Sequence, residues 1–151
     1  MHKILFICHG NICRSPMAEF LLKDMVAKRG ITSMFDIASA ATSREELVNP
    51  VHYGTRKKLA QFGISVVGKT ARQMTRRDYE NYDYIIAMDR NNLRNIDRII
   101  GSYDLHKVSL LFDFAGRNGQ SIADPWYTGD FDLTYDDVKA GLDGFLEYLG
   151  Y

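Results

Sequence analysis

The stretch that most constrains the fold is residues 3–16, where the apolar run KILFI leads directly into CHGNICRSP. A short, partly β-branched apolar run predicts a buried strand. Pro16 suits the first turn of a helix, so a helix is expected to begin near Arg14–Ser15. The backbone N–H groups at the start of that helix would point back into the loop that follows the strand.

The same alternation of strands and helices continues along the chain. Strands are predicted at 3–7, 35–40, 83–88 and 106–112, and helices at 15–28, 50–62, 91–100 and 134–149. This order favours an α/β fold with helices on both faces of a parallel sheet. The prediction is a single doubly wound domain, residues 1–151, with four parallel strands. Ligands of such sheets bind at the carboxyl ends of the strands, where the loop after residue 8 lies.

Composition narrows the classes of partner and location. Lys and Arg number 19, Asp and Glu also 19, and the start of the chain has too short an apolar run for a signal peptide or membrane span. Nucleic acid and membrane are therefore not expected as partners. The expected location is the cytoplasm, with release without a signal peptide as the alternative. Cys8 and Cys13, the only two cysteines, would stay thiols in a reducing compartment.

The loop of residues 8–15 has the features of an anion site. A helix start gathers N–H donors at one point, Gly10 permits conformations that a Cβ would forbid, and Arg14 offers a planar fork to phosphate oxygens. The same positive field favours the thiolate of Cys8, which would make it a nucleophile. Asn11 tolerates a left-handed conformation, and Ser15 either caps the helix or donates its hydroxyl to the sulfur. The structural alternative is that Cys8 is only a small buried apolar residue. A nucleotide-binding loop is disfavoured because its lysine is missing.

A phosphate ester also needs a general acid for its leaving group. Asp124 is the best candidate, since it follows the last predicted strand and Pro125 biases it toward an extended conformation. Trp126 and Tyr127, expected in a loop, could form walls for an aromatic substrate. The alternative is a polar turn whose two aromatic side chains fold back onto the core. Asp89 also lies at this edge, but capping of the helix at 91–100 is its expected role.

The histidines show no spacing typical of a metal site. His9 lies inside the loop, where it could tune the site, whereas His2, His52 and His106 are expected to be incidental. No metal and no cofactor are predicted.

The segments FICHGNICRSPMAE (6–19) and DPWYTGDF (124–131) together resemble the low-molecular-weight protein tyrosine phosphatases. ATSREE (41–46) and residues 71–93 fit the same family, so the resemblance spans nearly the whole chain. It implies a four-stranded parallel sheet with five helices and the hydrolysis of phosphotyrosine on proteins without a cofactor. Tyrosine-phosphorylated proteins would be the partners, and the chain would be a monomer or a weak oligomer.

The resemblance also implies a role for each matching residue. Cys8 attacks phosphorus to give a cysteinyl-phosphate, while Asp124 protonates the leaving oxygen and later activates water. Phosphate is held by Arg14 together with the other loop residues, which are His9, Gly10, Asn11, Ile12 and Cys13. Asn11 shapes the loop with Ser39, and Ser15 assists departure of the sulfur. Cys13 would form a reversible disulfide with Cys8 under oxidants.

The chain departs from the family pattern at the pocket rim. Residue 9 is His where several relatives carry Leu or Thr, and the loop at 42–53 lacks the Trp that walls the pocket of some members. Glu45, Glu46, Leu47 or Tyr53 could face the substrate instead, and these stay as alternatives. Relatives often have Gly at the position of Val48, so the shape of this loop cannot be carried over from those relatives.

Three other functions fit the sequence less well. Arsenate reductases of related fold need further cysteines, which this chain does not have. Protein arginine phosphatases typically carry Thr in the position of Ile12, and an apolar Ile12 suits a phenyl ring better. A non-catalytic phosphotyrosine-binding module would have lost the nucleophile or the acid, and both candidates are present.

Overall fold

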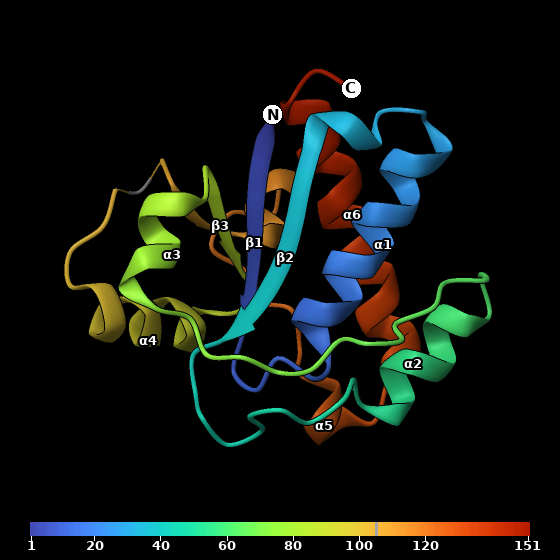
Figure 1. Cartoon of the computed structure of the whole chain (residues 1–151), viewed down its shortest axis with the longest axis horizontal. Coiled ribbons are helices and arrows are strands. Elements are labelled where there is room, and N and C mark those ends of the chain that lie inside the picture. The colour runs from blue at the N-terminus through green and yellow to red at the C-terminus, as the bar shows by residue number, and fades with distance from the viewer. Residues whose placement is uncertain (105) are drawn as a thin grey trace.

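The protein is built on one sheet of four parallel strands, as expected (Figure 1). The computed structural model describes residues 1–104 and 106–151. The strands lie in the order β2-β1-β3-β4. Their bounds are β1 His2–Cys8, β2 Phe35–Ala41, β3 Tyr84–Ala87 and β4 Val108–Leu110. β1 therefore has a neighbour on each side, and Cys8 is its last residue.

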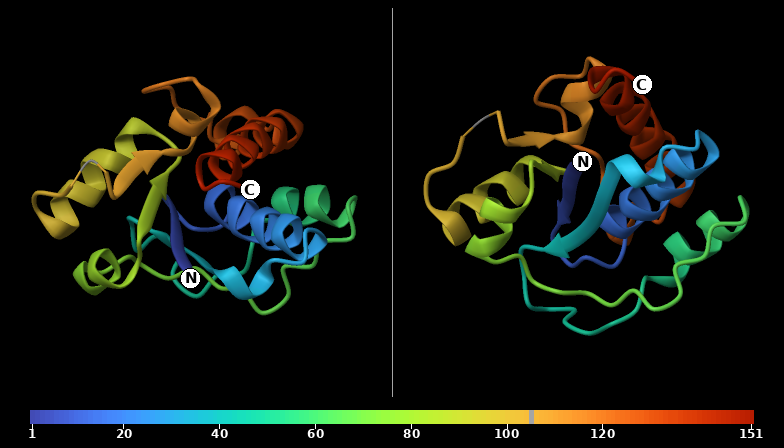
Figure 2. Two further views of the ribbon diagram at one scale, coloured as in Figure 1. Left: turned by 90° about the horizontal axis from the view of Figure 1, so that it is seen from above. Right: turned by 45° about the horizontal axis from the view of Figure 1, so that its top comes forward.

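Helices cover both faces of the sheet (Figure 2). α1, α2 and α6 lie on one side, and α3 and α4 lie on the other. The α-helices are α1 Arg14–Lys28, α2 Tyr53–Ala60, α3 Arg76–Asn81, α4 Arg90–Ile100, α5 Pro125–Thr128 and α6 Phe131–Tyr148. Two short 3₁₀ helices, η1 Thr32–Met34 and η2 Leu111–Ala115, complete the described elements.

The alternation of side chains along β1 explains the two layers. Ile4, Phe6 and Cys8 belong to the core under α1 and α6, whereas Leu5 and Ile7 belong to the core under α4. Successive side chains of a strand point to opposite faces, so a strand buried on both sides reads as a continuous apolar run. The register of β1 places the thiol of Cys8 on the α1 side of the sheet, where the site is built.

Several predicted bounds were wrong because side chains cap the elements. The strand predicted at 106–112 ends at Leu110, whose N–H donates to the Asp113 carboxylate over 3.1 Å as η2 begins. The helix predicted at 134–149 starts at Phe131, since Asp130 accepts a hydrogen bond from Leu133 N. The helix predicted at 50–62 is shorter, Tyr53–Ala60. The helices α3 and α5 were not predicted from periodicity, because each is too short to show one.

The chain ends lie at the edge of the sheet away from the carboxyl ends of the strands (Figure 1). There His2 Nε2 is 3.3 Å from the hydroxyl of Tyr151. Within the two described ranges, no helix has the length and apolar character needed to span a bilayer. The opposite edge carries the loop after β1, the segment after β2 and α5.

Candidate active site

The loop between β1 and α1 forms the centre of the site. Asn11 has φ 59°, the left-handed conformation expected for it. Gly10 is not among the residues with positive φ, so the expected conformational reason for this glycine was wrong. A Cβ at Gly10 would lie 3.3 Å from Glu46 Cγ, a tight contact that would require that side chain to shift slightly. In the described chain, the N–H groups of Gly10, Ile12 and Cys13 have no protein acceptor.

A chain of short hydrogen bonds holds the thiol of Cys8. The Asn11 N–H donates to Cys8 Sγ at 3.3 Å, and Ser15 Oγ lies 3.1 Å from the same sulfur. Asn11 Nδ2 donates both to Ser15 Oγ at 2.8 Å and to Ser39 Oγ at 2.9 Å. Because Ser15 Oγ already accepts from Asn11, its own hydrogen is free to point at the sulfur.

The series of hydrogen bonds continues into a buried ion pair below the loop. The Ser39 hydroxyl donates to Glu19 Oε1 at 2.5 Å, and Glu19 is only 4% exposed. Lys69 Nζ donates to the Ser39 carbonyl at 2.8 Å and lies 3.4 Å from Glu19 Oε1. Burial lowers the pKa of Lys69, although the charge of Glu19 opposes this effect. The pair fixes Ser39, and through it Asn11.

The Arg14 side chain is almost completely buried, at 2% exposure. Its Nη1 donates to Asp89 Oδ2 at 2.7 Å and to the Ile122 carbonyl at 2.9 Å, and Nη2 donates to Asp124 Oδ2 at 3.3 Å. Burial alone would lower the pKa of Arg14, but the negative charges of Cys8, Asp89 and Asp124 outweigh it and raise that pKa. Its Nε is one of two buried side-chain polar atoms without a partner among the described residues.

Asp124 precedes α5 in the extended conformation expected before Pro125, with φ −81° and ψ 116°. Its Oδ1 caps the helix by accepting from Trp126 N at 3.0 Å, while Oδ2 faces Arg14. Trp126 and Tyr127 lie in α5, not in a loop, and are 58% and 83% exposed. Their side chains are therefore not folded back onto the core.

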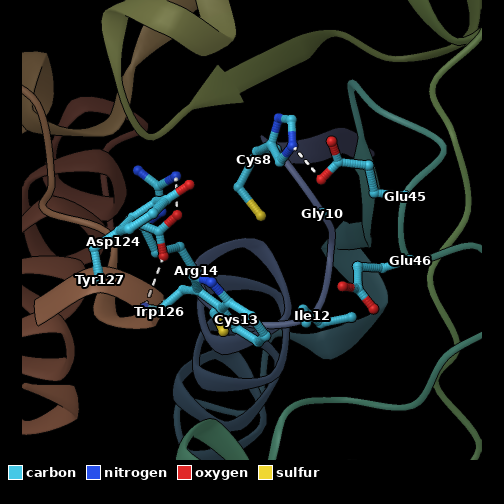
Figure 3. A pocket seen from close by; sticks show the side chains of 11 residues that line it. Cys8, Gly10, Ile12, Cys13, Arg14, Glu45, Glu46, Asp124, Trp126 and Tyr127 are labelled. Carbon is cyan, nitrogen blue, oxygen red and sulfur yellow. Dashed lines mark hydrogen bonds and ion pairs between the residues drawn. The ribbon is translucent and has the colours of Figure 1, made fainter. Parts of the chain in front are cut away.

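These segments surround a cavity of about 110 Å³ (Figure 3). Cys8 and Arg14 lie within it, Asp124, Trp126 and Tyr127 on one side, and Glu45 and Glu46 on the other. The remaining lining residues are His9, Gly10, Ile12 and Cys13. Every predicted site residue except Asn11, Ser15 and Ser39 lines this cavity. The Asn11 side chain binds the two serines, away from the cavity. Of the four rim candidates, Leu47 and Tyr53 do not line it.

The second thiol, Cys13, has a different environment from Cys8. It precedes α1 and is 5% exposed. Burial, and next the negative charge of Cys8, raise the pKa of Cys13 to about 12. Cys13 is therefore a neutral thiol at physiological pH, and both cysteines are free.

Three residues of the site were missed or misread from the sequence. Asp89 caps α4 as expected, but its second oxygen also binds Arg14. Glu19 could have been noticed as a carboxylate within the apolar face of α1. His52 is not incidental, because it caps α2 by accepting from Gly54 N at 3.0 Å and contacts Trp126. Over residues 1–104 and 106–151, no group of three or more His, Cys, Asp or Glu side chains is arranged to hold a metal.

Comparison with known proteins places this arrangement in one family. The model of the family described as "Low molecular weight phosphotyrosine protein phosphatase" matches residues 3–150. The low molecular weight protein-tyrosine-phosphatase YfkJ of Bacillus subtilis is 37% identical over 147 residues, which are 97% of this chain and 94% of that protein. The human low molecular weight phosphotyrosine protein phosphatase is 35% identical over 148 residues, 95% of this chain and 93% of the relative.

Solved structures agree with the sequence comparison. The crystal structure of YfkJ superposes with a TM-score of 0.94 at 36% identity, covering 99% of this chain and 94% of the other. The crystal structure of DARP, described as a drosophila arginine phosphatase, has a TM-score of 0.87 at 28% identity, with 99% and 98% covered. The fold is thus shared with a protein named for a different substrate.

Proposed function

Since this chain belongs to the low molecular weight phosphotyrosine protein phosphatase family, whose members are hydrolases, we propose that it hydrolyses phosphotyrosine on proteins through a cysteinyl-phosphate. One observation carries the proposal. Arg14 lines the cavity beside Cys8, and its buried Nε has no protein partner. A buried guanidinium N–H without an acceptor is costly unless a ligand supplies one. A phosphate oxygen is the ligand that suits this donor and the free amides of the loop.

The first step is the transfer of the phosphoryl group to sulfur. The Cys8 thiolate attacks phosphorus, the S–P bond forms, and the bond from phosphorus to the tyrosine oxygen breaks. Asp124 gives its proton to the departing oxygen, so tyrosine leaves as a neutral phenol. Arg14 and the loop amides hold the three remaining phosphoryl oxygens, and no metal is needed to balance their charge.

The second step releases phosphate. Asp124, now a carboxylate, takes a proton from a water molecule that attacks the phosphorus of cysteinyl-phosphate. The S–P bond breaks and the sulfur leaves as a thiolate. The Ser15 hydroxyl, 3.1 Å from this sulfur, stabilises the thiolate together with the Asn11 amide. Ile12 gives the pocket an apolar surface that suits the phenyl ring of tyrosine.

The test is hydrolysis of para-nitrophenyl phosphate and a phosphotyrosine peptide by wild type, Cys8→Ser and Asp124→Asn. Cys8→Ser is expected to lose turnover while still binding vanadate. Asp124→Asn is expected to slow phenyl-ester cleavage by about 10²–10⁴-fold, the usual contribution of a general acid. The matched control is Asp132→Asn, whose side chain is 80% exposed and lies outside the cavity. Turnover by Cys8→Ser, or loss of activity on adding a chelator, would refute the mechanism.

A peptide carrying phosphoarginine serves as the competing substrate in the same assay. Preferential cleavage of phosphoarginine would show that the chain acts like the arginine phosphatase of similar fold. Faster cleavage of phosphotyrosine is the result expected here.

We also propose that the chain acts in the cytoplasm or another reducing compartment, in keeping with its two free thiols. A peroxide would oxidise the Cys8 thiolate to a sulfenic acid. The Cys13 thiol would then displace water and close a disulfide that protects the nucleophile.

A further inference from the structure

The two walls of the cavity differ in chemistry. Trp126 and Tyr127 form one side, whereas Glu45 and Glu46 form the other, with Cys8 between them (Figure 3). The segment after β2 thus presents two neighbouring carboxylates at the mouth of a site built for an anion. These carboxylates require an explanation, because a phosphate dianion is repelled by them.

The two glutamates are held in different ways. Glu45 Oε2 lies 2.9 Å from His9 Nε2, and both side chains are substantially exposed, at 70% and 45%. Glu46 Oε2 accepts from the neutral amide of Asn49 at 2.7 Å, and its stem packs against Gly10. In the described part of the chain, neither glutamate forms an ion pair with a lysine or arginine.

The protein cations near the site do not balance these charges. Arg14 is already paired with Asp89 and Asp124 at the base of the cavity. Arg44 precedes the glutamates in the chain but does not line the cavity. A positive charge that approaches with the substrate would therefore meet two carboxylates that no lysine or arginine of the described residues neutralises.

The opposite wall suits a cation as well. Trp126 and Tyr127 line the cavity and are more than half exposed, so their rings are accessible to a substrate. A guanidinium or ammonium group is attracted to the face of such a ring, most strongly to that of Trp. Both walls therefore favour a positive charge on the residues that flank the bound phosphotyrosine.

We propose that this phosphatase selects phosphotyrosine sites flanked directly by lysine or arginine, and that Glu45 and Glu46 determine this preference. The proposal rests on the proposed function, since the phosphotyrosine must first occupy the cavity. The glutamates act on the flanking residues and take no part in the chemical steps. Acidic phosphotyrosine sites would be the poorest substrates, because they bring like charges together at the mouth.

The experiment uses three phosphotyrosine peptides that differ only at the positions immediately before and after the phosphotyrosine, with Lys, Gln or Glu at both. At low salt, kcat/KM for the Lys peptide is expected to exceed that for the Glu peptide about 5–20-fold, as for a few exposed ion pairs. The ratio should shrink on raising the ionic strength to about 0.5 M, because salt screens exposed charges.

The decisive variant is the double substitution Glu45→Gln and Glu46→Gln, which keeps the side-chain shape. It should reduce the Lys-to-Glu ratio to about 1–2-fold, since exposed ion pairs supply the preference. The matched control is Glu80→Gln with Glu147→Gln, which removes the same charge at exposed positions outside the cavity. The control should keep the wild-type ratio. Thermal melting of both variants checks that each is folded.

The outcomes separate the two proposals. Equal cleavage of all three peptides by wild type, or a ratio unchanged in the Glu45 and Glu46 variant, would overturn the substrate preference and leave the phosphatase function intact. Failure of wild type to cleave any of the peptides would overturn the proposed function itself.

Discussion

His52 should position the segment that carries Asp124, and its replacement tests this. The His52 ring stacks on Phe131 with 5.3 Å between ring centroids and an interplanar angle of 10°. It also lies in a T-shaped arrangement with the Trp126 ring, with 5.6 Å between ring centroids, and the backbone N–H of Trp126 donates to Asp124. On its other side, His52 N donates to the Ile12 carbonyl at 2.8 Å. One residue thus joins the loop between β1 and α1 to α2 and α5.

The magnitude follows from the contacts that His52→Ala removes. Loss of the cap on Gly54 N costs about 1 kcal/mol, and loss of two aromatic pairs costs about 0.5–1.5 kcal/mol each. The free energy of unfolding should therefore fall by about 2–4 kcal/mol, which lowers Tm by roughly 5–15 °C in a chain of this length. Because Asp124 loses its support, kcat should fall more for phenyl phosphate, which needs the acid, than for para-nitrophenyl phosphate.

Two conservative variants separate the cap from the stacking. His52→Asn can still cap α2 but cannot stack, so it should recover only the cap's contribution of about 1 kcal/mol while the kcat ratio between the two esters stays altered. His52→Phe can stack but cannot cap, so it should recover the ratio and stay only about 1 kcal/mol less stable than wild type. Thermal melting and steady-state kinetics measure both quantities. If His52→Asn and His52→Phe gave the same ester ratio, the stacking would have no role in placing Asp124.

Two further predictions concern charges near the thiols. The pKa of Cys13 is raised from its ordinary 9.0 to about 12, so the folded protein retains a proton that the unfolded chain releases above pH 9. As pH rises from 9 to 12, the free energy of unfolding of wild type should fall by up to about 4 kcal/mol more than that of Cys13→Ala. Urea unfolding of both proteins measures this, and an equal fall in the two would contradict it. Asp89→Asn can still cap α4 but weakens the hold on Arg14, so kcat/KM should fall about 10–100-fold with little change in Tm. Asp89→Ala should reduce both kcat/KM and Tm. An equal Tm for Asp89→Asn and Asp89→Ala would show that the cap on α4 does not stabilise the protein.

The sequence was sufficient to predict the layers of the fold and the core of the site. A buried apolar strand, a left-handed Asn11 and a helix begun at Arg14 are local features, each dictated by neighbours in the chain. The four strands were found because each is a short apolar run. Their exact ends were not, since caps such as Asp113 and Asp130 depend on side-chain contacts that periodicity does not reveal.

Contacts between distant segments were the part that sequence reasoning missed. Asp89 lies 75 residues from Arg14, and Glu45 lies 36 residues from His9. Both pairs form only because parallel strands bring their following loops to one edge of the sheet. Knowing that edge predicts which loops meet, but not which side chains within them do. This is why Glu45 and Glu46 could not be chosen over Leu47 and Tyr53.

The contacts of Arg14 show how that edge prepares the site before a substrate arrives. Two different segments hold the Nη atoms of Arg14, through Asp89 in one and Ile122 and Asp124 in the other. The Arg14 side chain is only 2% exposed. These three bonds use three of the five guanidinium N–H donors, and they fix the orientation of Nε, which has no partner among the described residues. Under the proposed function a phosphate oxygen would accept from Nε, whose direction the bonds of the two Nη atoms have already fixed.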